Sequence, residues 1–473
     1  MGQFRTNILH RLTRVAPRYL PFADVASETA PLSRLLRLSL FQVSVGMALV
    51  LLVGTLNRVM IVELDVPASL VAVMLALPLV FAPFRALIGF KSDQHRSALG
   101  WRRVPYIWKG TMLQFGGFAI MPFALLVLSG YAESADAPLW IGHSSAALAF
   151  LLVGAGVHTV QTVGLALATD LVDVEDQPKV VGLMYVMLLV GMIVSALVFG
   201  WLLSDYTPGR LVQVVQGAAV VTIVLNLIAL WKQEPRDRAR AANPPPVEAF
   251  SQAWSVFSAR AGTMRLLIVI ALGTMAYGMA EVLLEPYGGQ VLQMSVAMTT
   301  RLTAVLAAGG LIGFAIASRV LLRGAEPLRV ATAGAAIGVP AFLAIAAAAQ
   351  LGGIALFTLG TFVSGIGAGL FGHGTLTATM RRAPRAQIGL ALGAWGAVQA
   401  TAAGIAIAAG GIVRDVLLAL PQTTEPAAAY VPVFLAEALL LVAALWAIWR
   451  LNGRSSRKSD PQPYRHSLET PDV

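Results

Sequence analysis

A few polar side chains lie inside long apolar stretches of this sequence, and they are its candidates for chemistry. His158 lies near the middle of one such stretch, three residues before Gln161, and His373 lies in another. Imidazole is the commonest side-chain metal ligand, so either histidine could bind the central metal of a porphyrin-like pigment. The alternative is a histidine that is hydrogen-bonded to a neighbouring helix. Gln161 adds polarity to a pocket around His158 without identifying its occupant.

Two glutamates form the second candidate group. Glu281 and Glu285 are four residues apart, which places them on one face of a helix, and Arg301 opens the next apolar stretch. A charge inside a membrane is costly, so such residues are usually functional or paired. The glutamates could orient a ligand or carry protons, or they could form a structural pair with Arg301. Pro286 is expected to end the helix directly after them.

Soluble chemistry is not indicated anywhere in the chain. There are no cysteines, which excludes disulfides, thiolate chemistry and cysteine-ligated metals. The chain has no phosphate-binding loop and no nucleophile or zinc-protease motif, so we expect no enzyme activity and no directly bound metal ion. The formal charge of +10 lies mostly at the ends of apolar stretches, which indicates membrane topology and not a nucleic-acid partner.

Composition identifies the elements that must position these groups. Hydrophobic residues make up 57% of the chain and charged residues 12%, about half of the ~25% of a soluble domain. A helix crosses the hydrocarbon with roughly 20 apolar residues. By that length the sequence predicts an all-α membrane protein with twelve transmembrane helices, with Gly352-Gly353 dividing the long uncharged run Val330–Met380. The other spans are Leu38–Asn57, Val66–Phe84, Gly110–Ala132, Ala137–Thr169, Val180–Ser204, Leu211–Trp231, Leu266–Pro286, Leu302–Ser318, Ala386–Val413 and Pro426–Trp449.

Charge placement predicts the topology and the division of the chain. Lys and Arg concentrate in alternate loops, so both termini are expected in the cytoplasm and the chain is expected to be a multi-pass protein of the bacterial inner membrane. A polar linker containing Pro244-Pro245-Pro246 separates six spans from six. The expected segments are an N-terminal interfacial segment 1–34, a six-helix bundle 35–232, a linker 233–263 with an amphipathic helix, a second bundle 264–451 and a basic tail 452–473.

Charged and polar residues at span ends are expected to reach the interface. Asn57 and Arg58 end the first span, and Arg85 lies near the inner end of the second. Long basic side chains commonly bury their stems and extend their charges to water. Snorkelling therefore accounts for these residues, and pairing of Arg85 with Asp93 is the alternative.

Glycine spacing predicts close helix packing. Gly309 and Gly313 are four residues apart, as are Gly365 and Gly369. Such spacing lets membrane helices approach closely through their backbones. A groove for a flat ligand is the alternative interpretation of the same residues.

The loop after the second span resembles the signature of the major facilitator superfamily. It carries Gly89 and Asp93, followed by Gly100, Arg102 and Arg103, although its middle is longer than usual. Glycine permits a tight turn, and aspartate can pair with arginine or cap a helix. We assign this motif to conformational control. The resemblance implies a fold of two pseudo-symmetric six-helix halves, with a site between them near mid-membrane.

Longer strings resemble a more specific family. They are LLRLSLFQVSVGMA, GTLNRVMIVEL, SDQHRSALGWRRVPYIW, LQFGGFAIMPFALL and EPYGGQVL, and together they are similar to the PucC/LhaA family, or bacteriochlorophyll delivery family, of purple phototrophic bacteria. The resemblance implies an assembly factor that binds bacteriochlorophyll or a precursor as cargo and delivers it to light-harvesting antenna polypeptides. It also implies contacts with membrane lipid, with the assembling reaction centre and with pigment-synthesis enzymes.

Two other functions stay open on the sequence. A proton- or ion-coupled transporter of a small solute would use Glu281 and Glu285 as proton carriers. A pigment-free membrane chaperone would shelter antenna helices against its small-residue faces. If pigment is the cargo, His158 or His373 is the candidate ligand to its magnesium.

Overall fold

The structure is a computed structural model in which every described regular element is a helix. It describes residues 30–80, 85, 88, 91–92, 95, 100–130, 137–173, 176–234, 255, 258–260, 262–382, 388–421 and 425–455. The helices of the first part are α2 Leu32–Leu38, α3 Leu40–Leu49, η2 Val50–Leu56, α4 Asn57–Val62, α5 Ala68–Val80, α7 Val104–Ser129, α8 Leu139–Asp170, α9 Gln177–Leu202 and α10 Pro208–Leu230. Those of the second part are α13 Thr263–Gln290, α14 Val296–Leu322, α15 Pro327–Leu351, α16 Gly353–Arg382, α17 Ile388–Leu418 and α18 Ala427–Ser455.

Helix length and composition make this a multi-pass membrane protein. Within the described ranges, 11 helices are long and apolar enough to cross a bilayer, and a shorter apolar helix covers Ala68–Leu79. That shorter helix is the described part of the predicted span Val66–Phe84. The predicted break at Gly352-Gly353 is confirmed, because α15 ends at Leu351 and α16 begins at Gly353, whose φ is +54°. Glycine tolerates this left-handed conformation without a side-chain clash.

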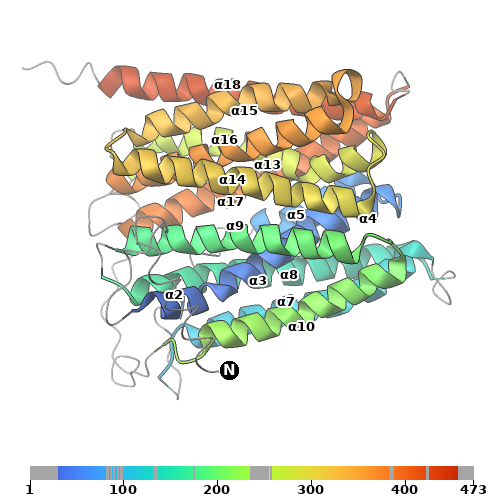
Figure 1. Ribbon diagram of the computed structural model, residues 1–473, viewed down its shortest axis with the longest axis horizontal. Helices are drawn as coiled ribbons and strands as arrows, with labels where there is room; N and C mark the ends of the chain where they lie inside the picture. The colour runs from blue at the N-terminus through green and yellow to red at the C-terminus, as the bar shows by residue number, and fades with distance from the viewer. Residues whose placement is uncertain are drawn as a thin grey trace, which may run out of the picture.

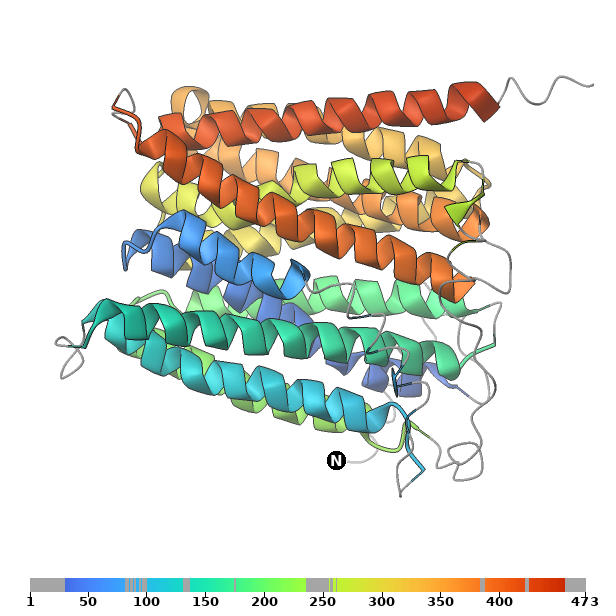
Figure 2. The ribbon, with the colours of Figure 1, turned by 180° about the vertical axis from the view of Figure 1, so that it is seen from behind.

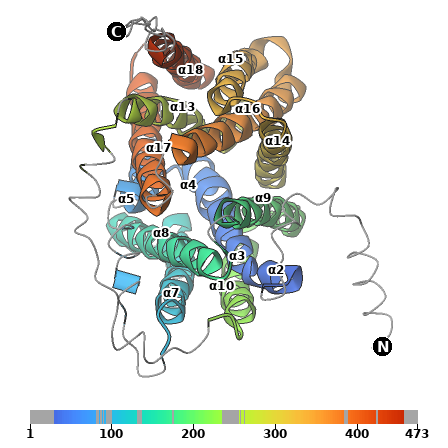
Figure 3. The same cartoon turned by 90° about the vertical axis from the view of Figure 1, so that its left-hand side faces the viewer.

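The helices lie in two groups (Figures 1 and 3). Helices α2–α10 form the first group and α13–α18 the second, with α5 packed against α17 and α9 against α14 where the groups meet (Figure 2). We call the end that holds the turns after α4, α9 and α13 the outer end, following the predicted topology. The inner end, where α2 begins and α18 ends, is on the left in Figure 1. The predicted amphipathic helix in the linker rests on Phe250, Trp254 and Phe257, and these three residues lie outside the described residues.

Small residues bring α14 and α16 into backbone contact, as their spacing predicts. A Cβ on Gly309 or Gly313 would overlap the carbonyl oxygen of Phe362 or Ile366. Membrane helices associate through such close approach, because lipid gives no hydrophobic force between them. The glycines therefore fix one wall of the space between the two groups.

Two expectations about the first and seventh spans are wrong. Pro286 does not end its helix: α13 continues to Gln290 with Pro286 inside it. Asn57 and Arg58 do not reach the interface, since they are 0% and 3% exposed and lie between the groups. Next to them the first span widens into the π-helix η2, an element that often marks functional sites.

Candidate functional site

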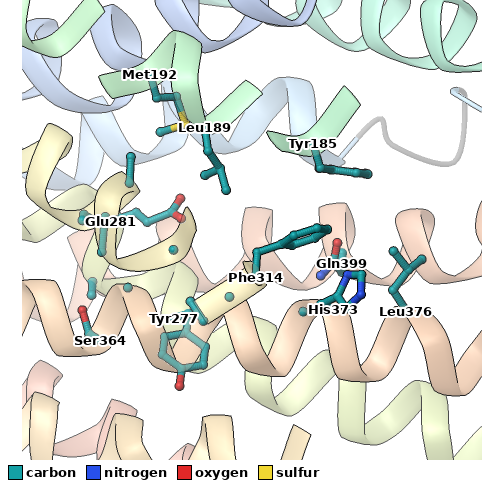
Figure 4. Close-up of a pocket in the computed structure, with 18 of the residues that line it drawn as sticks. Tyr185, Leu189, Met192, Tyr277, Glu281, Phe314, Ser364, His373, Leu376 and Gln399 are labelled. Atoms are coloured by element: carbon teal, nitrogen blue, oxygen red, sulfur yellow. The ribbon is translucent and has the colours of Figure 1, made fainter. Parts of the chain in front are cut away.

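A cavity lies between the two helix groups (Figure 4). Its volume is about 330 Å³, which lies within the ~300–1,000 Å³ range of small-molecule sites. Side chains from α9, α13, α14, α15, α16 and α17 line it, so both groups contribute to its walls. Its position between the groups is where the facilitator resemblance places a ligand site.

One face of α16 forms a wall of this cavity. Gly365, Ala368, Gly369 and Gly372 follow one another at helical spacing, between Ser364 and Leu376. At 1.5 Å per residue this face is about 18 Å long. Gly365 and Gly369 also pack against the backbone of α14, whereas a Cβ on Gly372 would meet nothing within 4 Å. Gly365 and Gly369 therefore pack helices, as their spacing predicts, and Gly372 leaves open space on the cavity wall. The groove for a flat ligand stays a prediction.

His373 contributes a half-buried imidazole to the cavity. Its ring lies edge-on to Phe314 with centroids 4.1 Å apart, and its Nδ1 has no hydrogen-bond partner among the described residues. Gln399 of α17 also lines the cavity. Tyr185 and Trp395 form a second edge-on pair on the wall, with centroids 6.3 Å apart. This end of the cavity thus combines an imidazole, whose Nδ1 is itself buried, with aromatic surfaces.

Glu281 and Glu285 lie in different surroundings despite their spacing. Glu281 projects into the cavity, at the end opposite His373 in Figure 4. Glu285 is 2% exposed and does not line the cavity. Its Oε1 accepts a hydrogen bond from Thr303 and lies against Gly54 of η2. Glu281 is therefore the carboxyl group that cargo could contact, while Glu285 belongs to the contact between helices.

Arg301 does not pair with either glutamate. It is exposed on α14 and donates a hydrogen bond of 3.3 Å to the carbonyl of Gly200 on α9. Among the described residues no ion pair joins it to Glu281 or Glu285. Arg301 thus links the two helix groups at the outer end and does not line the cavity.

His158 and Gln161 lie on α8 in a separate polar cluster. The guanidinium of Arg85 donates to Gln161 at 3.0 Å and to Thr162 at 2.9 Å, so Arg85 points into the bundle and does not snorkel as expected. His158 Nδ1 has no hydrogen-bond partner among the described residues. Neither His158 nor Gln161 lines the cavity, so the structure brings His373, and not His158, to it.

The loop motif is described only in its second part, because Gly89 and Asp93 lie outside the described residues. Gly100 has φ +79°, a conformation that favours glycine. Arg102 and Arg103 both pair with Asp170 at the end of α8, at 3.2 and 3.1 Å. These contacts hold the start of α7 to the first helix group at the inner end.

Several site residues were not singled out from the sequence. Tyr185, Trp395, Phe314 and Gln399 line the cavity, and Glu234 accepts hydrogen bonds from backbone N–H groups at the start of α7. Aromatic residues occur in many of the spans, so no local signal marks the ones that meet. Glu234 could have been singled out from the sequence, because it is an acidic residue directly after a span.

Comparison with known proteins shows what the chain resembles. The family model described as "PUCC protein" matches residues 55–456. Protein PucC of Rhodobacter capsulatus is 65% identical over 448 residues, which cover 93% of this chain and 97% of that protein. Protein PucC of Rhodovulum sulfidophilum is 66% identical over 418 residues, covering 88% and 92%. A solved nucleoside transporter, NupG, matches with TM-score 0.66 at 15% identity, covering 88% of this chain and 99% of that one. That likeness shows the fold, which is of the major facilitator type.

Proposed function

Because the chain belongs to the PUCC family, we propose that it is a light-harvesting assembly factor that binds bacteriochlorophyll or a precursor in the membrane and delivers it to antenna polypeptides. The observation that carries this proposal is the cavity between the helix groups, where His373 faces aromatic walls beside a flat glycine surface. Its membrane is the inner or intracytoplasmic membrane of a phototrophic bacterium. The assembling reaction centre and pigment-synthesis enzymes are further proposed partners.

The shape and chemistry of the cavity support a flat, apolar cargo. The small residues Gly365 to Gly372 of α16 run over about 10 Å of its face, and a tetrapyrrole ring is proposed to lie against it. Phe314, Trp395 and Tyr185 offer ring surfaces, and aromatic groups attract one another in offset or edge-on arrangements. A hydrocarbon tail needs no place in the cavity, because lipid solvates it.

His373 is the residue proposed to recognise the pigment's magnesium. Nδ1 of His373 is itself buried, so the ring nitrogen proposed to donate a lone pair to the metal is Nε2. Phe314 fixes the orientation of the ring from one side. No chemical change of the cargo is proposed, and the chain acts as a carrier and not as an enzyme.

The experiment is purification from a phototrophic host followed by an absorption spectrum of the protein. We expect bound bacteriochlorophyll or a precursor in the native protein, its loss in His373→Leu, and its retention in His158→Leu. The second variant is the matched control, because His158 is also on a membrane helix but does not line the cavity. Absence of pigment at any stoichiometry, together with normal antenna levels after deletion of the gene, would contradict the proposal.

A proton-coupled solute transporter is the second candidate, and Glu281 is the observation that favours it. This glutamate projects into the cavity of a facilitator-type fold. Intramembrane carboxyl groups in such positions commonly carry protons. If this function is correct, Glu281→Gln abolishes pH-dependent uptake of a solute into vesicles. That uptake does not depend on whether the protein contains pigment. Unchanged uptake would exclude this role for Glu281.

A further inference from the structure

Hydrogen bonds that join described residues of the two helix groups gather at the outer end. The hydroxyls of Thr55 and Thr300 lie 3.1 Å apart. Two residues further along the chain, the side-chain amide of Asn57 donates to the carbonyl of Val282 at 2.6 Å. All four residues are buried, so these bonds are shielded from water. They tie η2 and α4 of the first group to α14 and α13 of the second.

Further bonds extend this contact across the whole outer end. Arg58 donates to the carbonyl of Met294 at 3.2 Å, and the backbone N–H of Ser69 donates to Asp415 at 2.6 Å. Together with the bond from Arg301 to Gly200, they connect α5 with α17, α14 with α9, and α4 with the turn between α13 and α14. We call this set the outer seal: Thr55, Asn57, Arg58, Ser69, Gly200, Val282, Met294, Thr300, Arg301 and Asp415.

Away from the outer seal, the described parts of the two groups meet through apolar packing. A Cβ on Gly404 of α17 would lie 2.9 Å from the Cβ of Leu79 on α5, and one on Gly310 of α14 would lie 3.7 Å from a methyl of Leu189 on α9. No hydrogen bond joins described residues of the two groups in this region. As far as the structure describes the two groups, their contact is therefore hydrogen-bonded at the outer end and apolar elsewhere.

The bilayer makes this difference decisive. When two apolar helix faces separate in a membrane, lipid chains replace the lost contacts, so the separation costs little. When buried hydrogen-bonded groups separate there, their polar atoms lose partners that lipid cannot supply. Opening at the inner end thus replaces contacts between helices by contacts with lipid. Opening at the outer end leaves hydrogen-bond donors and acceptors unpaired.

We propose that the outer seal is a permanent hinge and that the cavity opens only at the inner end, between the helix groups. A transporter that alternates its access must separate its helix groups first at one end and then at the other. In this chain the hydrogen bonds of the outer seal oppose separation at the outer end. If the cargo is the pigment of the proposed function, it enters and leaves within the inner leaflet and does not cross the bilayer. The direction of cargo movement rests on that proposed function, but the position of the opening does not.

Single-cysteine labelling tests the position of the opening without any pigment. The chain has no cysteines, so each introduced thiol is the only one. Gly372→Cys places a thiol in the cavity, where a Cβ meets nothing within 4 Å. Ala297→Cys places one beside the outer seal, at a residue that is 5% exposed. Two exposed residues of α14 supply the controls, Met298→Cys at the outer end and Leu322→Cys at the inner end.

A membrane-impermeant maleimide is applied to right-side-out and inverted vesicles. We expect the cavity thiol to react at least about tenfold faster from the side on which the Leu322→Cys control reacts, because a minor open state is populated at ~10% or less. The Ala297→Cys thiol is expected to stay unreactive from both sides. Comparable labelling of the cavity thiol from both sides would overturn the proposal.

A covalent lock on the outer seal gives the second measurement. In Thr55→Cys/Thr300→Cys the two thiols replace hydroxyls that lie 3.1 Å apart, so a mild oxidant can join them. We expect the oxidised protein to bind added bacteriochlorophyll as well as its reduced form does. Binding that is lost on oxidation and restored by reduction would show that the outer end must open. If neither form binds pigment, the proposed function fails and the labelling experiment alone decides the position of the opening.

Discussion

Asn57 of the first helix group donates a hydrogen bond to the Val282 carbonyl of the second, at the position where α13 lacks a donor of its own. In a regular helix this carbonyl would accept from the N–H of residue 286, but Pro286 has no N–H. Asn57 is completely buried and its amide takes the place of that missing group. The sequence GTLNRV and the sequence EPYGG are thus complementary across the molecule.

A double-mutant cycle on Asn57 and Pro286 measures this complementarity. Asn57→Ala leaves a buried carbonyl unpaired and should lower the free energy of unfolding by about 1–3 kcal/mol. In a Pro286→Ala background the restored N–H bonds Val282, so the same change should cost less, with a coupling of roughly 0.5–3 kcal/mol. Thermal unfolding in detergent is the measurement. Thr358→Ala, at an exposed site with a local hydrogen bond, is the control, and strictly additive effects would contradict the prediction.

Filling the cavity should remove the cargo without destabilising the protein. Gly372→Leu adds a side chain where a Cβ meets nothing within 4 Å, and the residue lines the cavity. We expect co-purified pigment to fall by at least about tenfold, equivalent to ~1.4 kcal/mol of binding. The melting temperature should not fall, because leucine favours helix over glycine by up to ~1 kcal/mol.

The matched control for that variant is Gly217→Leu. Gly217 lies on α10, is exposed, and likewise has nothing within 4 Å of a built Cβ. It shares the gain in helix propensity but does not line the cavity. Equal pigment loss in both variants would show that the cavity is not the cargo site.

Close packing of α14 against α16 predicts that substitution of Gly313 destabilises the protein, unlike substitution of Gly372. A Cβ there would overlap the carbonyl of Ile366, and a backbone atom cannot move aside as a flexible side chain can. Gly313→Ala should therefore lower the free energy of unfolding by about 1–3 kcal/mol, the usual cost of overpacking. Gly372→Ala on α16 is the control that should leave stability unchanged or raise it. Equal melting temperatures for the two variants would contradict the described contact.

The sequence predicts the helices better than it predicts their contacts. Uncharged runs and the Gly352-Gly353 pair locate the spans because each helix satisfies its own backbone in lipid, independently of its neighbours. Four-residue glycine spacing predicts that the helices that carry it pack closely, although it does not name their partners. These features depend on one segment at a time, so one sequence is enough to find them.

Contacts between distant segments could be identified only from the structure. Asn57 and Arg58 resemble ordinary span-end residues, and nothing local shows that Val282 and Met294 are their partners. Glu281 and Glu285 lie on the same helix but in different surroundings. Glu285 packs against Gly54 of a distant span, whereas Glu281 lines the cavity. Facing in a membrane helix is difficult to infer when apolar residues cover all sides, because lipid-facing and buried positions use the same residue types.

Glu234 provides the last test, at the inner end of the molecule. Its carboxylate accepts backbone hydrogen bonds from Arg102, Arg103 and Val104 at 2.7–3.0 Å, and so satisfies N–H groups that α7 cannot satisfy itself. Glu234→Ala should remove a cap worth about 0.5–2 kcal/mol and free the loop that precedes α7. Tryptic cleavage after Arg102 and Arg103 should then accelerate by roughly 5–30-fold if local opening costs one or two kcal/mol less. Asp205→Ala, which breaks an exposed pair with Arg210, is the control and should leave cleavage unchanged, because such surface pairs contribute little. If Glu234→Ala and Asp205→Ala are cleaved at the same rate, Glu234 does not hold the start of α7, and the contacts of Arg102 and Arg103 with Asp170 must secure it alone.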